Sequence, residues 1–338
     1  MELSLSELKA SRVAVLGAGA WGGTLAWLLA SAGKKVSLWG RNPGKIKDLR
    51  DSGRLPDPLP VPIPADLRLT ADLADAVSGA RLIIVATSSQ SMKAVAASLA
   101  AAGAADGTLV VSAAKGLSME TLERMSEVIE SNLPGAVALA LSGPNLAYEI
   151  RSGLPTAAVV ACADLEMARA VQECLSVRTL RLYAADDIAG VELGGTLKNI
   201  IAIAAGASDG LDLGVNAKAA LMTRGLAEMV RLSTRLGASP ATLYGLSGMG
   251  DLIATCQGPL SRNYRFGKIL AAGRDLSAAL AEVGSCVEGV ATTRAVCELS
   301  QKLAIDLPIA RQVRSTLDGE VTPEESIMAL MRRPLVTE

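Results

Sequence analysis

The sequence predicts an α/β fold, in which a doubly wound and mainly parallel sheet is followed by an all-helical C-terminal domain. Three observations predict it: strand-like runs alternate with helical patterns in the first half, a glycine-rich turn joins the first strand to the first long helix, and no convincing strand follows residue 187. A chain of 338 residues is long enough for two cores. We expect one domain over residues 1–187 and a second over residues 188–338.

The first strand leads into the glycine-rich turn Gly17-x-Gly19-x-x-Gly22. After a short helical lead-in over residues 1–11, we expect a strand at 12–16, a helix at 24–32 and a second strand at 35–39. In this context the glycines let the backbone approach a pyrophosphate, and the helix N-terminus supplies N–H groups and a positive dipole. A tight turn without a ligand is the alternative. The turn predicts a Rossmann-like domain that binds NAD or NADP.

The remaining elements follow from apolar runs and helical periodicity. Further strands are expected at 68–70, 82–87, 108–112, 136–141 and 156–160. Helices of the first domain are expected at 89–102, 119–131 and 165–175, and those of the second at 188–208, 215–236, 261–272, 289–303, 308–318 and 323–332. The proline-dense stretch 56–64 is expected to be an ordered loop over the sheet. Ligands of such sheets bind beyond the carboxyl ends of the strands, which directs attention to residues 112–116 and 142–145.

Arg41 follows the second predicted strand, where folds specific for NAD place an acidic residue that binds the ribose hydroxyls. No acid is present there, and the arginine is placed to bind a 2′-phosphate. A solvated arginine that opens a loop is the alternative. We expect NADPH to be used at least as well as NADH.

Lys198 lies in an apolar helical stretch at 191–206, with Asp186 and Asp187 as a start signal. No acidic residue shares its helix face, and burial of an unpaired ammonium costs several kcal/mol. The ammonium group either reaches water at a domain surface or has a functional role. The small residues around Lys198 and Asn199 leave room for a ligand.

Polar residues gather at the turns of the helical domain. Asp251 is flanked by glycine, which indicates a backbone close to a ligand or a helix cap. Ser261 is expected to cap the following helix and to place Arg262 and Asn263 in its first turn. An arginine at this position opposes the helix dipole, a mild cost that anion binding would offset.

The composition excludes several classes of protein. Lys and Arg total 33 against 34 Asp and Glu, so no nucleic-acid partner is indicated. Five cysteines without a C-x-x-C spacing suit a reducing cytoplasm and indicate no metal site. The N-terminus lacks a signal core, and no long apolar run predicts a membrane span. The chain contains no histidine, which excludes His-based dehydrogenases and Ser-His-Asp hydrolases.

Taken together, the motifs make the chain similar to the bacterial type of NAD(P)-dependent glycerol-3-phosphate dehydrogenase, over essentially its whole length. The motifs are residues 17–22, 38–41, 115–116, 142–149, 191–199, 216–220, 223–225, 250–255, 261–263 and 287–289. The resemblance implies reversible hydride transfer between NAD(P)H and C2 of dihydroxyacetone phosphate. The product is sn-glycerol 3-phosphate, which supplies phospholipid synthesis. The resemblance also implies a cytoplasmic homodimer that holds no metal and does not insert into a membrane.

The resemblance also implies roles for individual residues. Lys198 would be the general acid/base, with Lys115 and Asp251 as further catalytic residues. Burial and the charge of Lys115 would depress the pKa of Lys198. The positions that match substrate contacts are Lys115, Gly143, Asn145, Lys198, Asn199, Asp251, Thr255, Ser261, Arg262 and Asn263. Those that match cofactor contacts are Gly17, Gly19, Ala20, Trp21, Gly22, Arg41, Lys115, Ala147, Arg262, Val287 and Glu288.

The chain departs from the family pattern at two places. Asn145 stands where relatives usually have Ser or Thr, which affects one substrate hydrogen bond, and Gly23-Thr24 replaces the commoner Thr-Ala, with no expected consequence. Three other interpretations compete: a β-hydroxyacid or 6-phosphogluconate-type dehydrogenase, a sugar-nucleotide dehydrogenase with Cys256 as nucleophile, and an idle dinucleotide-binding sensor. The motifs at 250–251 and 261–263 favour the glycerol phosphate family.

Overall fold

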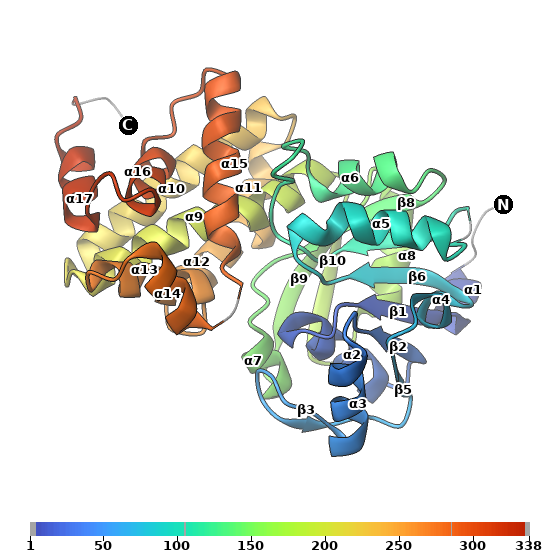
Figure 1. Ribbon diagram of the computed structural model, residues 1–338. Helices are drawn as coiled ribbons and strands as arrows, with labels where there is room; N and C mark the ends of the chain where they lie inside the picture. Colours follow the sequence, from blue (N-terminus) through green and yellow to red (C-terminus); the bar gives the residue numbers. More distant parts are fainter. Residues whose placement is uncertain (1–4, 105, 285, 335–338) are drawn as a thin grey trace.

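The protein is described by a computed structural model over residues 5–104, 106–284 and 286–334. Figure 1 shows two lobes, one built on a sheet and one made of helices. The lead-in helix predicted for residues 1–11 is α1, Leu5–Ala10, while residues 1–4 lie outside the described part of the chain.

A single eight-stranded sheet forms the centre of the N-terminal lobe, in the order β10-β9-β8-β7-β6-β1-β2-β5. Its strands are β1 Arg12–Leu16, β2 Val36–Trp39, β5 Leu67–Thr70, β6 Ala80–Val85, β7 Leu109–Ser112, β8 Val137–Ser142, β9 Thr156–Ala161 and β10 Leu180–Ala185. Every neighbouring pair is parallel except β8 with β9. The order reverses beside β1, which confirms the Rossmann-like, mainly parallel sheet.

Helices cover both faces of this sheet because its strands are apolar on both sides. In β1, Val13 and Val15 face one buried cluster while Ala14 and Leu16 face another. The helices of this lobe are α2 Ala20–Ser31, α3 Pro43–Ser52, α4 Leu73–Val77, α5 Met92–Ala101, α6 Met125–Asn132, α7 Ala147–Arg151 and α8 Leu165–Leu175. The sheet is therefore doubly wound, as predicted.

Four details of this lobe differ from the sequence prediction. The strand β10 was not among the predicted strands, although it completes the sheet beside β9. The helix expected at 119–131 begins only at Met125, because residues 118–123 close a turn in which Leu122 has φ 62°. The proline-dense stretch contains a two-stranded hairpin, β3 Arg54–Leu55 with β4 Val61–Pro62. The short helices α3, α4 and α7 were not predicted, since too few turns are present to show a periodic pattern.

The described residues after 187 contain helices and no strand, as predicted. The helices are α9 Ile188–Gly210, α10 Gly214–Arg235, α11 Pro240–Leu243, α12 Asp251–Cys256, α13 Arg262–Ala271, α14 Leu276–Val283, α15 Glu288–Lys302, α16 Pro308–Leu317 and α17 Pro323–Met331, with a π-helical turn, η2, at Leu246–Gly250. The elements α11, η2, α12 and α14 were not predicted. In the sequence these elements are short segments that lie between glycines and prolines.

The central helix of this lobe is α9, which is surrounded by α10, α12, α13 and α15 (Figure 1). The Asp187 carboxylate caps it by accepting a hydrogen bond from the Gly190 N–H at 2.8 Å, as the sequence predicts. Among the described helices it alone is long and apolar enough to cross a membrane, and 83% of that apolar window is buried inside the protein. Its apolar composition thus serves the core.

Candidate active site

Lys198 lies on α9 between the two lobes, and its side chain is almost completely buried. Its residue is 6% exposed, which rules out a lysine that reaches water at a domain surface. The facing elements are the loop after β7, which carries Lys115, the end of β8 at Gly143, and α12, which carries Asp251 and Thr255. All five residues were predicted as site residues, and the fold brings them together.

The Asp251 carboxylate is shared by two ammonium groups. Lys198 Nζ donates to Asp251 Oδ1 at 2.7 Å, and Lys115 Nζ donates to Asp251 Oδ2 at 2.6 Å. Lys198 also donates to Thr255 Oγ1 at 2.5 Å, and Lys115 donates to the Gly143 carbonyl at 3.0 Å. The expectation that Lys198 lacks an acidic neighbour holds only along its own helix, because α12 supplies the carboxylate from 53 residues away.

Burial is the main influence on the charge of Lys198. It lowers the pKa of the ammonium to about 8, while the nearby Asp251 carboxylate opposes this and the Lys115 charge adds to it. Lys198 is therefore poised to gain and lose a proton near neutral pH, which is the property required of a general acid/base.

Glycines on α9 set how closely these groups approach one another. A Cβ on Gly195 would lie 2.2 Å from Ser142 Oγ, and one on Gly194 would lie 2.6 Å from the Ser247 carbonyl oxygen. The small residues before Lys198 therefore admit the end of β8 and the η2 turn, rather than a ligand as the sequence suggested. This close packing is what places Asp251 and Gly143 beside Lys198.

Asn145 follows β8 at the edge of this cluster. Its amide nitrogen and oxygen are both buried, yet neither has a hydrogen-bond partner in the protein. Buried amides of native proteins are nearly always paired, so an orphaned one beside a cluster of charges indicates that a ligand completes it.

Asn199 and Asn263 instead bind each other. Asn263 Nδ2 donates to Asn199 Oδ1 at 2.9 Å, and Asn263 Oδ1 accepts from the Gly289 N–H at 3.0 Å. These bonds join α9, α13 and α15. Both amides brace the helices beneath the site, and their contact with substrate stays a prediction.

Ser261 and Arg262 open α13 as predicted. Ser261 Oγ accepts a hydrogen bond from the Tyr264 N–H at 3.2 Å, so it caps the helix. Arg262 is exposed in the first turn, and its charge acts on Glu288 at the start of α15. Burial raises the pKa of Glu288, while the Arg262 and Lys115 charges and the Ser89 N–H oppose this. Val287, the residue before α15, is buried next to it.

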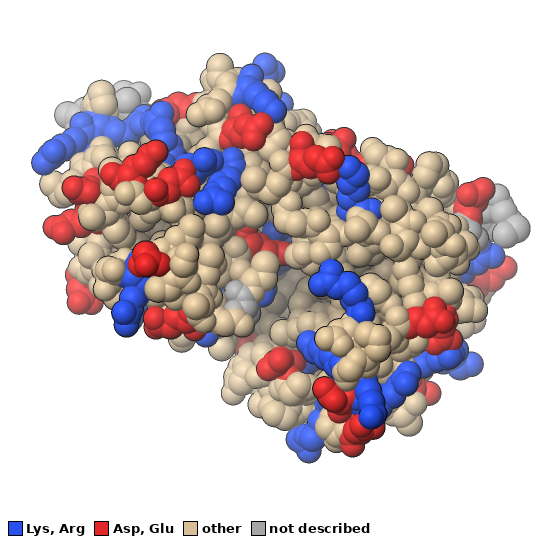
Figure 2. Space-filling view, in the orientation of Figure 1, with Lys and Arg blue, Asp and Glu red and all other residues tan. Residues whose placement is uncertain are grey.

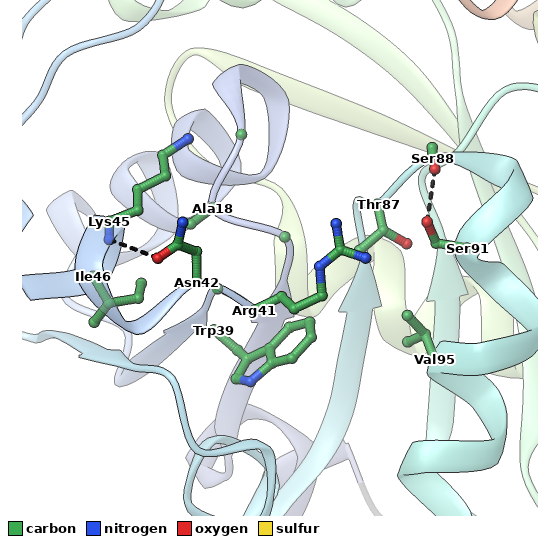
Figure 3. A pocket seen from close by; sticks show the side chains of 13 residues that line it. Ala18, Trp39, Arg41, Asn42, Lys45, Ile46, Thr87, Ser88, Ser91 and Val95 are labelled. Atoms are coloured by element: carbon green, nitrogen blue, oxygen red, sulfur yellow. Dashed lines mark hydrogen bonds between the residues drawn. The ribbon is translucent and has the colours of Figure 1, made fainter. Parts of the chain in front are cut away.

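The second part of the site is a cavity of about 300 Å³ at the carboxyl ends of β1, β2 and β6 (Figure 3). Its wall includes the predicted cofactor residues Gly17, Gly19 and Arg41. None of the described residues that line the cavity carries a carboxylate. Arg41 points toward Thr87 across the cavity, as Figure 3 shows.

The residues at this cavity fit a dinucleotide. The helix α2 begins at Ala20 with Trp21 and Gly22 in its first turn, and no side chain caps its N-terminal N–H groups. A Cβ on Gly22 would lie 2.0 Å from the Gly17 carbonyl oxygen, so the turn requires glycine. Thr87 Oγ1 lines the cavity and is buried without a partner. Free N–H groups, a dipole and an orphaned hydroxyl suit a phosphate-containing ligand.

Among the cavity residues that were not predicted as site residues are Thr87, Asn42 and Lys45. Asn42 Oδ1 accepts the Lys45 N–H at 3.2 Å and caps α3, which places Lys45 in the wall one helical turn after Arg41. The Asn42-Pro43 pair is a helix start signal that predicts this geometry. Ala147, a predicted cofactor contact, begins α7 on the other side of α2.

Another residue that was not predicted is Glu192, six residues before Lys198 on α9. Its buried carboxylate accepts hydrogen bonds from the Ser126 N–H at 2.8 Å, Ser126 Oγ at 2.6 Å and Arg124 at 2.9 Å. These donors belong to the start of α6, so this carboxylate ties the catalytic helix to the sheet lobe. No local sequence pattern marks such a contact.

Comparison with known proteins gives the family. The model described as NAD-dependent glycerol-3-phosphate dehydrogenase N-terminus matches residues 12–168, and the corresponding C-terminus model matches residues 187–328. The chain belongs to this family. It is 44% identical over 327 residues to glycerol-3-phosphate dehydrogenase (NAD(P)+) of Synechococcus sp. (strain JA-3-3Ab), covering 97% of both chains. Its fold matches the crystal structure of glycerol-3-phosphate dehydrogenase from Coxiella burnetii with a TM-score of 0.91 and 36% identity, covering 96% of this chain and 100% of that one.

Family membership confirms the resemblance read from the sequence, and one rival interpretation loses support. Cys256 is fully buried, and burial raises the pKa of its thiol to about 12, so it cannot serve as the nucleophile of a sugar-nucleotide dehydrogenase. A D-mandelate dehydrogenase shares the fold alone, with a TM-score of 0.60 at 14% identity. The two-lobed fold is thus common to several dehydrogenases, and the site must distinguish them.

Proposed function

We propose that this member of the family catalyses the reversible, NAD(P)H-dependent reduction of dihydroxyacetone phosphate to sn-glycerol 3-phosphate. The observation that carries the proposal is the buried Lys198–Asp251–Lys115 cluster, in which Lys115 of the sheet lobe meets Lys198 and Asp251 of the helical lobe.

Lys198 is the proton donor in this proposal. When bound, the reduced nicotinamide supplies the hydride that C2 of the substrate receives. The Lys198 ammonium gives its proton to the carbonyl oxygen at C2, which becomes the hydroxyl of the product. The neutral amine then recovers a proton from water. In the oxidation direction the neutral amine takes the hydroxyl proton.

Asp251 and Lys115 prepare the site for this step. The carboxylate holds both ammonium groups in place, so neither has to reorganise when charge develops on the substrate oxygen. Lys115 contributes a fixed positive charge beside that oxygen. Thr255 Oγ1 donates to the Asp251 backbone carbonyl at 2.6 Å and thereby keeps its hydroxyl oriented toward Lys198.

The substrate phosphate has a cationic partner in Arg262, whose guanidinium is exposed at the N-terminus of α13. The helix dipole adds to this attraction. The orphaned amide of Asn145 supplies hydrogen bonds to substrate, in the role that Ser or Thr has in relatives.

The cofactor occupies the cavity at the carboxyl ends of β1, β2 and β6. Arg41 and Lys45 provide two cations near its ribose end, and none of the described residues that line it is a carboxylate that would repel a 2′-phosphate. We therefore infer that NADPH is used at least as well as NADH. A cytoplasmic homodimer remains the expectation from the resemblance, and light scattering on the purified protein measures the oligomeric state.

The test is a spectrophotometric assay that follows loss of NADPH or NADH absorbance with dihydroxyacetone phosphate. Parallel reactions contain dihydroxyacetone, which lacks the phosphate, and 2-keto acids, which a β-hydroxyacid dehydrogenase would reduce. We expect turnover that depends strongly on the phosphate. Faster turnover of a 2-keto acid would contradict the proposal, and cofactor binding without turnover of any substrate would favour a sensor.

A further inference from the structure

Arg151, the last residue of α7, is a buried arginine that belongs to no part of the site described above. It is 5% exposed, and all its hydrogen bonds run to neutral oxygen atoms. Its Nε donates to Thr24 Oγ1 at 2.9 Å, and its Nη1 donates to the carbonyls of Leu55 at 3.1 Å and Leu59 at 2.9 Å. A buried guanidinium is costly, so three directed bonds to two segments, the helix α2 and the β3–β4 hairpin, indicate a specific use.

The departure Gly23-Thr24 from the family pattern is what accommodates this arginine. A Cβ on Gly23 would lie 3.1 Å from Arg151 Nη2, a distance that forces one of the two to move. Thr24 supplies the acceptor for Nε and itself donates to the Ala20 carbonyl at 2.7 Å. The sequence analysis attached no consequence to this departure, whereas the structure shows that both residues contact Arg151.

Arg151 thereby connects two segments that the proposed function assigns to the cofactor and substrate. Through Thr24 it reaches Ala20, the first residue of α2, where the N–H groups for the pyrophosphate lie. On its own side it ends α7, which begins at Ala147, two residues after the orphaned amide of Asn145. Its other two hydrogen bonds, to the carbonyls of Leu55 and Leu59, hold the hairpin β3–β4 against α2 and α7.

We propose that Arg151 is a positioning residue, which fixes α7 relative to the first turn of α2 and so sets the affinity for the dinucleotide. The inference rests on the proposed binding of NAD(P)H at α2. If the hydrogen bond to Thr24 is lost, α7 is no longer held in a fixed position relative to the start of α2. The cofactor contacts at Ala20 and Ala147 then no longer lie at the spacing that one bound dinucleotide requires.

The experiment compares Thr24→Val with Thr24→Ser in the full-length protein. Valine keeps the shape of threonine but leaves the buried Arg151 Nε without an acceptor, whereas serine keeps the hydroxyl. Arg151→Met removes the guanidinium outright. Val171→Ala is the control, because Val171 is fully buried in α8, which packs on β9 and β10. Each variant is measured for thermal midpoint, NADPH Kd by fluorescence titration, and KM for dihydroxyacetone phosphate at saturating NADPH.

For Thr24→Val and Arg151→Met we expect the NADPH Kd to rise about five- to twentyfold, since small displacements in a preorganised site are costly. The substrate KM should change less than the Kd, Thr24→Ser should stay close to wild type, and Val171→Ala should lower the midpoint without changing the Kd. A fall in the midpoint for Thr24→Val with an unchanged Kd overturns the inference, even if Arg151→Met does not fold. Absence of NADPH binding by the wild type would instead overturn the proposed function, and the inference with it.

Discussion

The two ends of the proposed site are built in opposite ways. At the reaction end Lys198, Asp251 and Thr255 are 6%, 2% and 3% exposed and are hydrogen-bonded to one another. At the nucleotide end Arg41 and Lys45 are exposed at the wall of an open cavity. Among the described residues, neither of these two cations has an ion-pair partner. Figure 2 shows basic and acidic side chains together on the surface of both lobes, whereas Lys198 and Asp251 are buried.

This difference determines how each end responds to change. In the buried cluster, removal of the Asp251 carboxylate would leave two ammonium groups unpaired in a medium of low dielectric, which costs several kcal/mol, and removal of Lys198 would take away a buried titratable group that water cannot replace. At the exposed cations water replaces a lost partner, and salt screens the attraction. We therefore expect large effects on catalysis at the first end and moderate, salt-dependent effects on binding at the second.

The largest effect is expected for Lys198→Met, which removes the proton donor but keeps the apolar length of the side chain. Turnover should fall by roughly 10²–10⁴, the usual contribution of a positioned general acid, with little change in NADPH binding. Stopped-flow measurement of the hydride step and a fluorescence titration with NADPH test this. Near-wild-type kcat at every pH would remove Lys198 from the mechanism.

The pH dependence of the wild type follows from the lowered pKa of Lys198, about 8. Reduction requires the protonated amine, so its rate should fall as the pH rises through about 8, while the oxidation rate should rise over the same interval. The Asp251 carboxylate raises the pKa of Lys198, so Asp251→Asn should move both midpoints to lower pH and also reduce kcat. Unmoved midpoints in Asp251→Asn would show that the titrating group is elsewhere.

Arg262→Ala tests the boundary between the two ends, because Arg262 is exposed but lies beside Glu288 and the helix N-terminus. The KM for dihydroxyacetone phosphate should rise about ten- to a hundredfold, the scale of a charge-assisted phosphate contact. The smaller substrate dihydroxyacetone serves as the matched control, since it lacks the phosphate. An equal loss with both substrates would mean that Arg262 has a structural role.

The sequence predicted the elements whose residues repeat a simple pattern. The strands are continuous apolar runs because both faces of the sheet are buried, and α9 begins after Asp187 because a carboxylate caps it there. Lys198 was identified because it is a charged residue within an apolar helical stretch. These features depend on residues close together in the chain.

The contacts that give those residues their chemistry could not be predicted in this way. The pairing of Lys198 with Asp251 depends on how η2 and α12 pack against Gly194, and Asn263 is occupied by Asn199 and Gly289 through the packing of three helices. The bond from Arg151 to Thr24 joins residues 127 positions apart. Such contacts arise from tertiary packing, which no local period records.

The smallest effects are expected at the nucleotide end, where Arg41 and Lys45 separate the two cofactors. Arg41 points across the cavity, whereas Lys45 is held in its wall by the capped start of α3, so both can approach a 2′-phosphate without a rearrangement of the backbone. Because the site is exposed, Arg41→Ala should weaken NADPH binding about tenfold and Lys45→Ala about two- to fivefold.

NADH is the internal control for both variants, since it carries every group of NADPH except that phosphate. Its Kd should change less than twofold, and the wild-type preference for NADPH should itself shrink as the salt concentration rises. The double variant should lose about the product of the two single effects if each cation contacts the phosphate independently. An equal loss of both cofactors in Arg41→Ala would mean that this arginine contacts the adenosine common to both. Cofactor binding at the nucleotide end would then depend on the shape of the cavity and not on the charge of Arg41.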